Sequence, residues 1–186
     1  MRFDETKLKG AYVIELEKRE DHRGFFARAW CQQESEAHHL ATQFVQGNLS
    51  YSKSAGTLRG MHYQASPHEE VKLVRCIRGA IYDVIIDLRP TSPTYCQWVG
   101  VELSAQNYKM LYVPKGFAHG FVTLEDSAEV FYLVSEFYAP GSEQGVRFDD
   151  PAFCITWPVP VSVISDKDGA WPLFVRNETG ESSRSR

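Results

Sequence analysis

The sequence predicts an all-β fold, a sandwich or a barrel. Short segments rich in Val, Ile, Tyr and Phe recur along its 186 residues, turns separate them at regular spacing, and very little of the chain has helical character. A chain of this length is sufficient for one sizeable core. We therefore expect a single domain at residues 1–175, followed by a polar, flexible tail at residues 176–186.

The first third of the chain contains strand-like segments and one candidate helix. The segment AYVIEL and the segment FFARAW are apolar and β-branched or aromatic, and a turn with the sequence DHRG separates them. The later segment that contains Gln46 and Asn48 is extended, with these amides alternating with apolar neighbours. The predicted elements are strands at 11–16, 25–30 and 44–51, a turn at 21–24, and a short helix at 32–40.

The rest of the chain reads as strand after strand. Residues 82–87 (YDVIID) are apolar on both faces, which suits a strand buried in the interior on one side and against another layer, such as a second subunit, on the other. The predicted strands are 71–76, 80–87, 98–103, 109–113, 118–124 and 129–135, with weaker candidates at 146–148 and 154–157.

Composition argues against several classes of function. The formal net charge is -4 and no basic run stands out, so we expect no nucleic-acid partner. No apolar run is long enough to span a membrane and no signal peptide is recognisable, so we expect no membrane association. The four cysteines are widely spaced and form no CxxC pair, which favours reduced thiols in a cytoplasmic protein over a zinc or redox site.

One motif raises the question of a metal. Residues 114–119 (PKGFAH) and the glycine six residues before His62 resemble the metal-binding motifs of cupin barrels. In those barrels a second histidine follows the first in an HxH pattern, but here that position is Gln64. A metal site needs three or four good ligands, so we expect a cupin barrel without metal and without another cofactor.

The chemistry centres on residues 56–64 (GTLRGMHYQ). A neutral imidazole at His62 is suited to proton abstraction near neutral pH, and Asp168 is a carboxylate that could orient it. Tyr132, within an apolar strand, could act as an acid from the opposite wall, and Lys72 could stabilise an enolate. Each of these side chains could instead be a hydrogen-bonded core residue, so this reading stays a hypothesis.

Further polar residues suit phosphates and sugar hydroxyls. Arg23, Arg59, Gln46 and Asn48 offer guanidinium and amide donors, although each could equally be a surface or turn residue. Side chains alternate along a strand, so Arg59 and His62 should face opposite sides unless Gly60 forms a bulge between them.

Taken together, these motifs resemble the dTDP-4-dehydrorhamnose 3,5-epimerase family. The resemblance runs in unbroken order from about residue 21 to residue 173. The matching stretches include DHRGFF, FVQGNLSYS, GTLRGMHYQ, KLVRCIRGAIYDVIIDLR, WVGVELSAQN, LYVPKGFAHGFVTL, AEVFYLVSEFYAP and SDKDGAWP.

The resemblance implies a jelly-roll cupin with a few short helices, usually a homodimer, that needs no metal or redox cofactor. Its substrate would be a nucleoside-diphosphate 4-keto-6-deoxy sugar of deoxysugar and lipopolysaccharide biosynthesis. Epimerisation would invert carbon 5, and carbon 3 as well, through an enolate. The resemblance implies His62 as the base with Asp168 as its partner, Tyr132 as the acid, and Lys72 as the cation that stabilises the enolate. It places His119 and Asp83 in the sugar pocket and Tyr138 near the nucleotide. The residues implied to bind the diphosphate and nucleoside, in part across the dimer, are Arg23, Gln46, Asn48 and Arg59.

One departure leaves the substrate open. Arg28 stands where thymidylyl-sugar members of the family commonly carry Glu, so a cytidylyl or guanylyl sugar, or inversion at one carbon only, stays possible. Three other readings also stay open. They are a 3,4-ketoisomerase, which usually has a second histidine where this chain has Gln64, a sugar-binding cupin without catalysis, and a metal-dependent dioxygenase.

Overall fold

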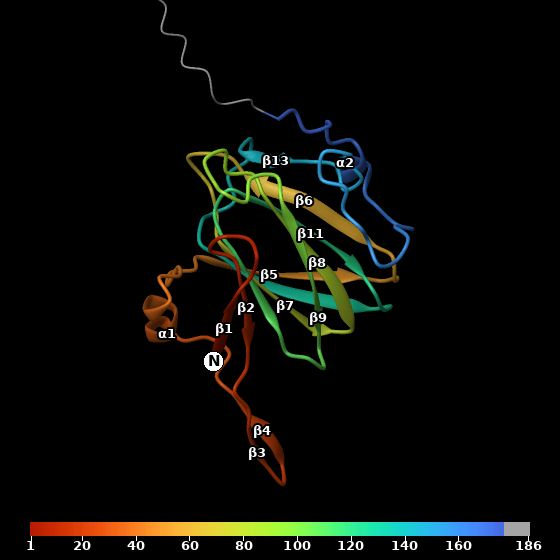
Figure 1. The fold of residues 1–186 in the computed structure, drawn as a ribbon. Coiled ribbons are helices and arrows are strands. Elements are labelled where there is room, and N and C mark those ends of the chain that lie inside the picture. Colours follow the sequence, from red (N-terminus) through yellow and green to blue (C-terminus); the bar gives the residue numbers. More distant parts are fainter. Residues whose placement is uncertain (177–186) are drawn as a thin grey trace, which may run out of the picture.

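Two antiparallel β-sheets stacked face to face form the body of the protein in the computed structural model, which describes residues 1–176 (Figure 1). One sheet has six strands in the order β1 (Arg2–Glu5), β2 (Tyr12–Glu15), β10 (Met110–Val113), β7 (Lys72–Arg78), β12 (Ala128–Val134) and β5 (Gln46–Ser52). The other has five strands in the order β13 (Glu143–Gly145), β6 (Leu58–Gln64), β11 (Phe117–Thr123), β8 (Ala80–Asp87) and β9 (Trp98–Ser104). This two-sheet arrangement confirms the all-β prediction and has the architecture of a jelly roll.

Three smaller elements complete the described part of the chain. Strands β3 (Arg19–Asp21) and β4 (Gly24–Phe26) form a separate hairpin, and the helices α1 (Gln32–Ala37) and α2 (Asp166–Gly169) are short. The predicted tail lies outside the described residues from 177 onward. Within residues 1–176, no helix is long and apolar enough to cross a membrane.

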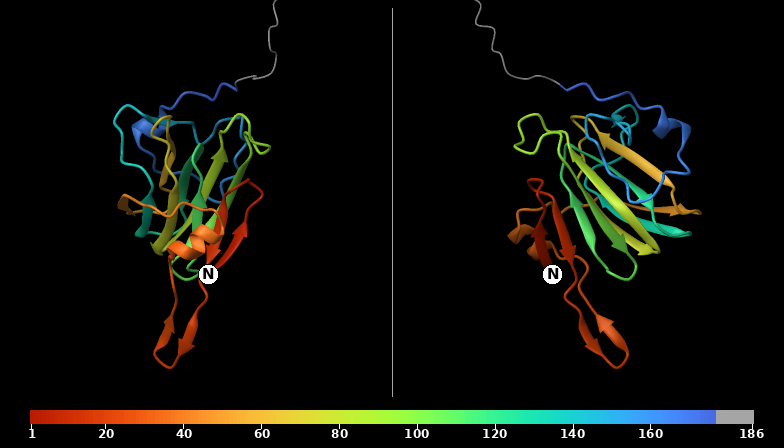
Figure 2. Two further views of the ribbon diagram at one scale, coloured as in Figure 1. Left: turned by 90° about the vertical axis from the view of Figure 1, so that its left-hand side faces the viewer. Right: turned by 45° about the vertical axis from the view of Figure 1, so that its right-hand side comes forward.

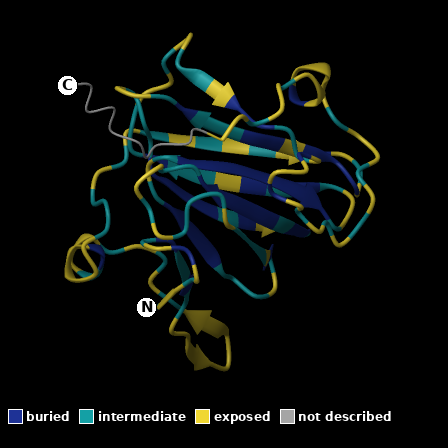
Figure 3. Ribbon diagram, turned by 45° about the horizontal axis from the view of Figure 1, so that its top comes forward, coloured by how far each residue is buried: buried dark blue, intermediate teal, exposed yellow. Residues whose placement is uncertain are grey.

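The main core fills the space between the sheets. Strand β7 contributes Val74 and β8 contributes Ile81 and Ile85, all fully buried, and Phe121 of β11 packs against them. Buried residues are concentrated in the central strands of the two sheets, while the loops are of intermediate burial or exposed (Figure 3). The sheets are thus held together along most of their length, and the pocket described below lies where polar residues replace this core.

The outer face of strand β8 is covered by the chain itself. Val84 and Ile86 are fully buried against Phe153, with Trp157 and Phe174 packed around them. The C-terminal segment therefore provides the second layer that the doubly apolar sequence of β8 requires. The suggestion that a second subunit covers this strand was wrong.

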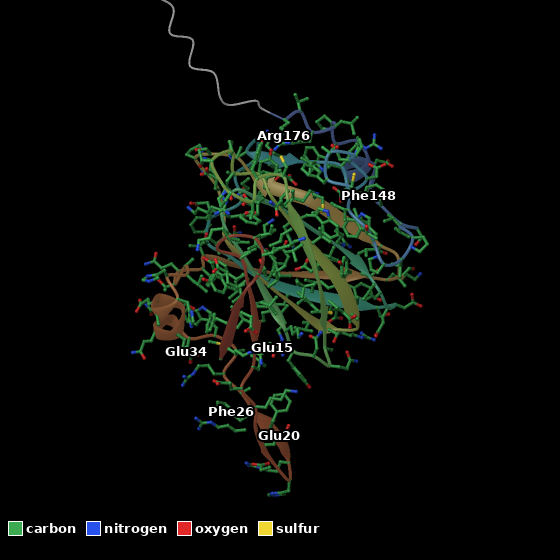
Figure 4. The ribbon with its side chains drawn as sticks, viewed as in Figure 1. Glu15, Glu20, Phe26, Glu34, Phe148 and Arg176 are labelled. Atoms are coloured by element: carbon green, nitrogen blue, oxygen red, sulfur yellow. The ribbon has the colours of Figure 1, made fainter. Side chains whose placement is uncertain are left out.

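The hairpin β3–β4 projects away from the two sheets (Figure 2). Every residue of both strands is exposed, and Phe26 at the end of β4 is 72% exposed (Figure 4). The predicted strand at 25–30 ends at Phe26 because the following residues have no neighbouring strand to pair with. A protruding hairpin with exposed aromatic side chains makes a surface that the isolated chain leaves uncovered.

Other boundaries also differ from the predictions. Helix α1 ends at Ala37 rather than at residue 40, because His39 adopts a φ of 58° and the amide of Leu40 turns back to the carbonyl of Ser35, which closes the helix. The weak strands at 146–148 and 154–157 are irregular segments of the covering layer, and the strand in this region is β13 instead.

Candidate active site

A pocket opens between the two sheets, and three side chains divide it into two lobes. The Glu70 lobe encloses about 660 Å³ and the His119 lobe about 570 Å³, open mouths included, which suits a small-molecule site. Both lobes share His62, Lys72 and Tyr132. The Glu70 lobe is further lined by Gln46, Asn48, Tyr63, Gln64, Glu70, Val134, Tyr138 and Glu143, and the His119 lobe by Ser50, Arg59, His119, Phe121 and Asp168.

His62 and Asp168 form a hydrogen-bonded pair. His62 Nε2 lies 2.7 Å from Asp168 Oδ1, and the other carboxylate oxygen accepts the amide of Gly60 at 3.2 Å. Asp168 is 5% exposed and sits on α2, whose N-cap Ser165 accepts the Asp168 amide. Because a carboxylate only accepts, Nε2 of a neutral His62 carries the hydrogen and Nδ1 keeps the lone pair. The pair predicted from sequence is therefore brought together.

The electrostatics keep His62 neutral. Burial lowers its pKa below the ordinary value of 6.5, and the hydrogen bond and charge of Asp168 offset that only in part. A base must be unprotonated to act, so His62 is in its working form at neutral pH.

A bulge in β6 brings Arg59 and His62 to the same lobe. His62 pairs with His119 of β11 while Arg59 pairs with Phe121, so the register of the two strands shifts between these positions. Gly60 adopts a φ of 135°, and a Cβ there would lie 2.5 Å from the Cα of Gly120. Only glycine fits this close approach. The bulge anticipated at Gly60 is thus present, and both side chains line the His119 lobe.

Tyr132 faces His62 from the other sheet. It lies on β12, paired with Asn48 of β5 and Val74 of β7, whereas His62 lies on β6. Burial raises the pKa of the Tyr132 phenol, and the charge of Glu70 raises it further. The phenol is therefore protonated at neutral pH and able to give up a proton, while the histidine across the pocket is able to accept one.

Lys72 begins β7 and is 8% exposed. Its Nζ lies 3.1 Å from Oε1 of Glu70, a residue that sequence reasoning did not single out. A buried ammonium requires a partner charge, and the pocket supplies it here. The ammonium lines both lobes, and its N–H groups can donate to a bound oxyanion there.

His119 and Asp83 form a second pair beneath the pocket. His119 Nε2 lies 2.6 Å from Asp83 Oδ1, and Asp83 is fully buried with Oδ2 lacking a hydrogen-bond partner. His119 lines its lobe as expected, but Asp83 lies behind it and is not part of the pocket wall. Asp83 can act on a ligand only through His119.

The amide and guanidinium residues of the body line the pocket as expected. Arg59 donates from Nε to Ser52 Oγ at 3.1 Å and from a terminal nitrogen to the carbonyl of Tyr51 at 2.8 Å, which fixes its side chain. Gln46 Oε1 accepts the amide of Tyr138 at 2.8 Å, so β5 holds the segment that carries this tyrosine. Asn48 lies between them on the wall of the Glu70 lobe.

Arg23 and Arg28 lie outside the pocket of their own chain. Arg23 is in the turn of the projecting hairpin, its side chain 78% exposed and paired with Asp21 (Figure 1). Arg28 follows the hairpin and donates to Glu34 of α1 at 2.9 Å. Within residues 1–176, neither guanidinium lines the pocket that contains His62.

Sequence reasoning missed Glu143 and Lys167. Glu143 lines the Glu70 lobe and accepts from Lys167 Nζ at 2.6 Å and from the Tyr138 hydroxyl at 3.2 Å. Burial raises the pKa of Glu143, but these hydrogen bonds outweigh it and leave the pKa below its usual range. Glu143 lies in a segment without strand periodicity, so the sequence carried no signal for it.

Gln64, at the position where a second histidine would complete a metal motif, is committed to the protein. Its Nε2 donates to the carbonyls of His68 and Phe137, and its Oε1 accepts the amide of Ala139. Among residues 1–176, no three His, Cys, Asp or Glu side chains come close enough together to hold a metal ion.

Comparison with known proteins gives one consistent result. The model of a family described as dTDP-4-dehydrorhamnose 3,5-epimerase matches residues 5–176. An enzyme with that name from Shigella flexneri is 43% identical over 176 residues, covering 94% of this chain and 97% of the relative. The crystal structure of the epimerase from Elizabethkingia anophelis NUHP1 superimposes with a TM-score of 0.90 at 42% identity, covering 94% of this chain and 96% of that one. The epimerase structure from Bacillus anthracis with TDP and PPi bound gives 0.89 at 44% identity, with 93% and 99% coverage.

Proposed function

Because this chain belongs to the dTDP-4-dehydrorhamnose 3,5-epimerase family, we infer that it is an isomerase that epimerises a dTDP-linked 4-keto-6-deoxy sugar for deoxysugar biosynthesis. The observation that carries this function is the placement of a neutral histidine and a protonated tyrosine on opposite sheets of one pocket. Inversion at carbon needs a base on one face of the ring and an acid on the other.

We propose the following roles for the pocket residues. Nδ1 of His62 takes the proton from the carbon beside the ketone, and the electron pair of that C–H bond moves into the carbonyl to give an enolate. The Lys72 ammonium stabilises the enolate oxygen. The enolate carbon then takes the phenol proton of Tyr132 from the opposite face. Before the next round the phenolate regains a proton from solvent and the His62 imidazolium releases its proton to solvent. Carbon 5 is inverted in this way. Carbon 3 is inverted by a second round of the same steps, after the sugar reorients so that this carbon lies between the base and the acid.

We propose that the diphosphate and nucleoside lie along Arg59, Gln46 and Asn48, with Tyr138 near the nucleotide. Arg59 is fixed by its bonds to the Ser52 hydroxyl and the Tyr51 carbonyl, Gln46 by accepting the Tyr138 amide, and Asn48 lies on the pocket wall. The Arg59 guanidinium is thus preorganised for an anionic ligand. His119, held by Asp83, contributes to the sugar end of the pocket.

We propose that the protein works as a homodimer in which the hairpin of one chain reaches the pocket of the other. The hairpin projects away from the two sheets (Figure 2), and it carries the exposed side chains of Phe26 (Figure 4) and of Arg23. Edge strand β5 and its neighbour β12 also leave apolar side chains uncovered, with Leu49 63%, Tyr51 49% and Phe131 39% exposed. Such a surface suits a second copy, and symmetry would place two hairpins at two pockets.

Mixing two inactive variants tests the dimer. In a hybrid of Arg23→Ala and His62→Ala chains, one pocket has an intact His62 and receives an intact Arg23 from the other chain. Random mixing gives hybrids in half of the dimers with one good pocket each, so about a quarter of wild-type activity should return. A mixture that stays inactive after subunits are shown to have exchanged would contradict the shared site.

We also propose a cytoplasmic role in making precursors for polysaccharides such as lipopolysaccharide. Four free cysteines without a disulfide are typical of a reducing compartment. Fractionation of cells followed by immunoblotting tests the location, and a periplasmic or extracellular signal would contradict it.

The activity is tested by proton NMR in deuterated water with dTDP-4-keto-6-deoxyglucose. Loss of the carbon-3 and carbon-5 signals is the expected result, and loss of one signal would identify a single-site epimerase. Because Arg28 carries a guanidinium near the hairpin, the same experiment is run with the cytidylyl and guanylyl sugars. Absence of exchange with all three nucleotides would favour a binding protein.

A further inference from the structure

Glu70 stands out among the pocket residues because none of the roles above requires it. It lies in the loop just before β7, separated from Lys72 by Val71, and it lines the same lobe as His62 and Tyr132. Its side chain is 13% exposed, and that of its partner Lys72 is 10% exposed. The two charges are therefore largely withdrawn from water at a place where a ligand must enter.

Such a pair is an expensive way to stabilise a fold. Burying a carboxylate and an ammonium costs more than apolar residues of the same size would, and the attraction between the charges often only balances that cost. Lys72 lies at the start of its strand, beside the pocket and not within the core between the sheets. The pair is better explained by the pocket than by the packing of the sheets.

We propose that Glu70 is a positioning residue of the active site, whose carboxylate fixes the Lys72 ammonium at the boundary of the two lobes where it meets the enolate oxygen of the substrate. The inference rests on the proposed function. It assigns to Glu70 no contact with the reacting atoms, because its action passes through Lys72.

The lysine needs such a partner. Its ammonium sits on a flexible four-carbon stem with three rotatable donors, so it has no fixed direction by itself. Glu70 Oε1 lies 3.1 Å from Nζ, and this ion pair holds the ammonium beside the two lobes that Lys72 lines. A donor that is aimed before the reaction begins stabilises developing charge without reorganisation.

Glu70 is itself held in place from behind. Its Oε2 accepts from Gln64 Nε2 at 3.3 Å, and Gln64 is 4% exposed. The same amide group binds the carbonyls of His68 and Phe137. The Glu70 carboxylate therefore accepts from an amide that also binds two loops, and on its other side it forms an ion pair with the Lys72 ammonium.

Glu70 also belongs to the ring of charges around Tyr132. Lys72 at the start of β7 and Glu70 in the loop before it lie on one side. Strand β6 contributes Arg59 and His62, and β13 contributes Glu143. After burial, the charges of Glu70 and Glu143 raise the pKa of Tyr132 while that of Arg59 lowers it. Removing the charge of Glu70 should therefore lower the pKa of this phenol.

The test compares Glu70→Gln with Glu69→Gln. Both variants remove one negative charge from the same loop, but Glu69 does not line the pocket. The measured quantity is the rate of solvent-deuterium incorporation at carbon 5, and the wild-type rate is measured first as the reference for both variants. Glu70→Gln should slow it by about tenfold or more, a fraction of the roughly 10²–10³-fold effect of deleting an oxyanion donor, while Glu69→Gln stays within about twofold.

A double-variant comparison separates positioning from a general structural role. In a Lys72→Met background, Glu70→Gln should cause no further loss of rate, because the group through which it acts is gone. A further loss of about tenfold in that background would overturn the proposal. The alkaline limb of the pH profile for formation of the inverted product, which needs the Tyr132 proton, should also move to lower pH in Glu70→Gln, and loss of packing alone would not produce this shift.

The proposal and the proposed function fail in different ways. If wild type does not exchange deuterium, the function is wrong, whereas an active wild type with Glu70→Gln equal to Glu69→Gln overturns the role of Glu70. If Glu70→Gln does not fold, Glu70→Asp replaces it. This variant keeps the charge but shortens the reach to Nζ, so it should lower the exchange rate, and an unchanged rate would overturn the proposal.

Discussion

Replacing Asp168 by Asn changes the active site while leaving its shape almost intact. The two side chains are isosteric, but the amide has lost the negative charge that faces His62 Nε2 at 2.7 Å. The amide can also present its NH₂ group to that nitrogen, which would favour the other tautomer of His62 and place the hydrogen on Nδ1. The base would then have its lone pair on the wrong nitrogen.

The size of the effect follows from this geometry. A hydrogen bond to a charged group contributes about 1.5–3 kcal/mol, and every 1.36 kcal/mol is tenfold in rate, so loss of the charge alone predicts a decrease of about 10- to 150-fold. A wrong tautomer adds to this, and a comparable Asp-to-Asn change in a hydrolase triad costs about 10⁴. We therefore expect Asp168→Asn to lower the rate of proton abstraction by about 10² to 10⁴.

The assay is deuterium incorporation at carbon 5 as a function of pH. Asp168 opposes the lowering of the His62 pKa, so its removal should move the acid limb to lower pH as well as reduce the maximum rate. Asp166→Asn is the matched control, since it removes an exposed carboxylate from the same helix. A rate for Asp168→Asn within threefold of the control, with an unshifted acid limb, would refute the role of this pair.

Three further predictions concern pH and stability. In wild type, the acid limb of kcat/KM should lie below pH 6.5, because burial lowers the pKa of His62 and the base is lost as pH falls through that pKa; a limb above 6.5 would contradict it. The same shift means that His62 takes up a proton at a higher pH in the unfolded chain than in the folded protein. Its contribution to stability should therefore fall as pH drops below 6.5, and urea unfolding at several pH values measures this change. Gly60→Ala should destabilise the fold by about 2 kcal/mol or more in thermal unfolding, because its Cβ would lie 2.5 Å from the Cα of Gly120. Gly141 also has a positive φ but has open space around it, so Gly141→Ala should cost about half as much. Equal losses would place the cost in backbone strain alone.

The positions of most strands in the two large sheets were predictable because their apolar residues follow recognisable strand patterns. The apolar run from Ala80 to Asp87 gave strand β8 with its true bounds, and the alternation around Gln46 and Asn48 gave β5 within two residues. What covers the outer face of β8 was not predictable, because the C-terminal residues that do so, such as Phe153 and Phe174, lie in irregular segments. Periodicity reports that a face is buried, but it does not report what buries it.

The polar residues of the pocket also divide into those that the sequence predicted and those that it did not. His62, Tyr132 and Lys72 lie on regular strands, and the resemblance to a known family pointed to each of them. Glu70 escaped notice because it lies in a loop where acidic residues are common, and Glu143 because its strand, β13, is too short to show a period. Only the folded structure reveals that Glu70 reaches Lys72 and that Glu143 reaches Lys167.

The position of Arg23 marks the limit of what one chain can explain. Sequence resemblance places it at the ligand, but the hairpin carries it away from the pocket of its own chain (Figure 1). A single sequence contains no direct record of which copy a side chain serves.

The division of labour between His62 and Tyr132 is tested by following exchange and inversion in the same sample. In deuterated water, Tyr132→Phe should still incorporate deuterium at carbon 5 but form inverted product about 10²–10⁴-fold more slowly, while His62→Ala should lose both exchange and inversion by a similar factor. If Tyr132→Phe inverted the sugar at the wild-type rate, or if His62→Ala still exchanged the proton at near-normal speed, the assignment of base and acid to the two sheets would be wrong.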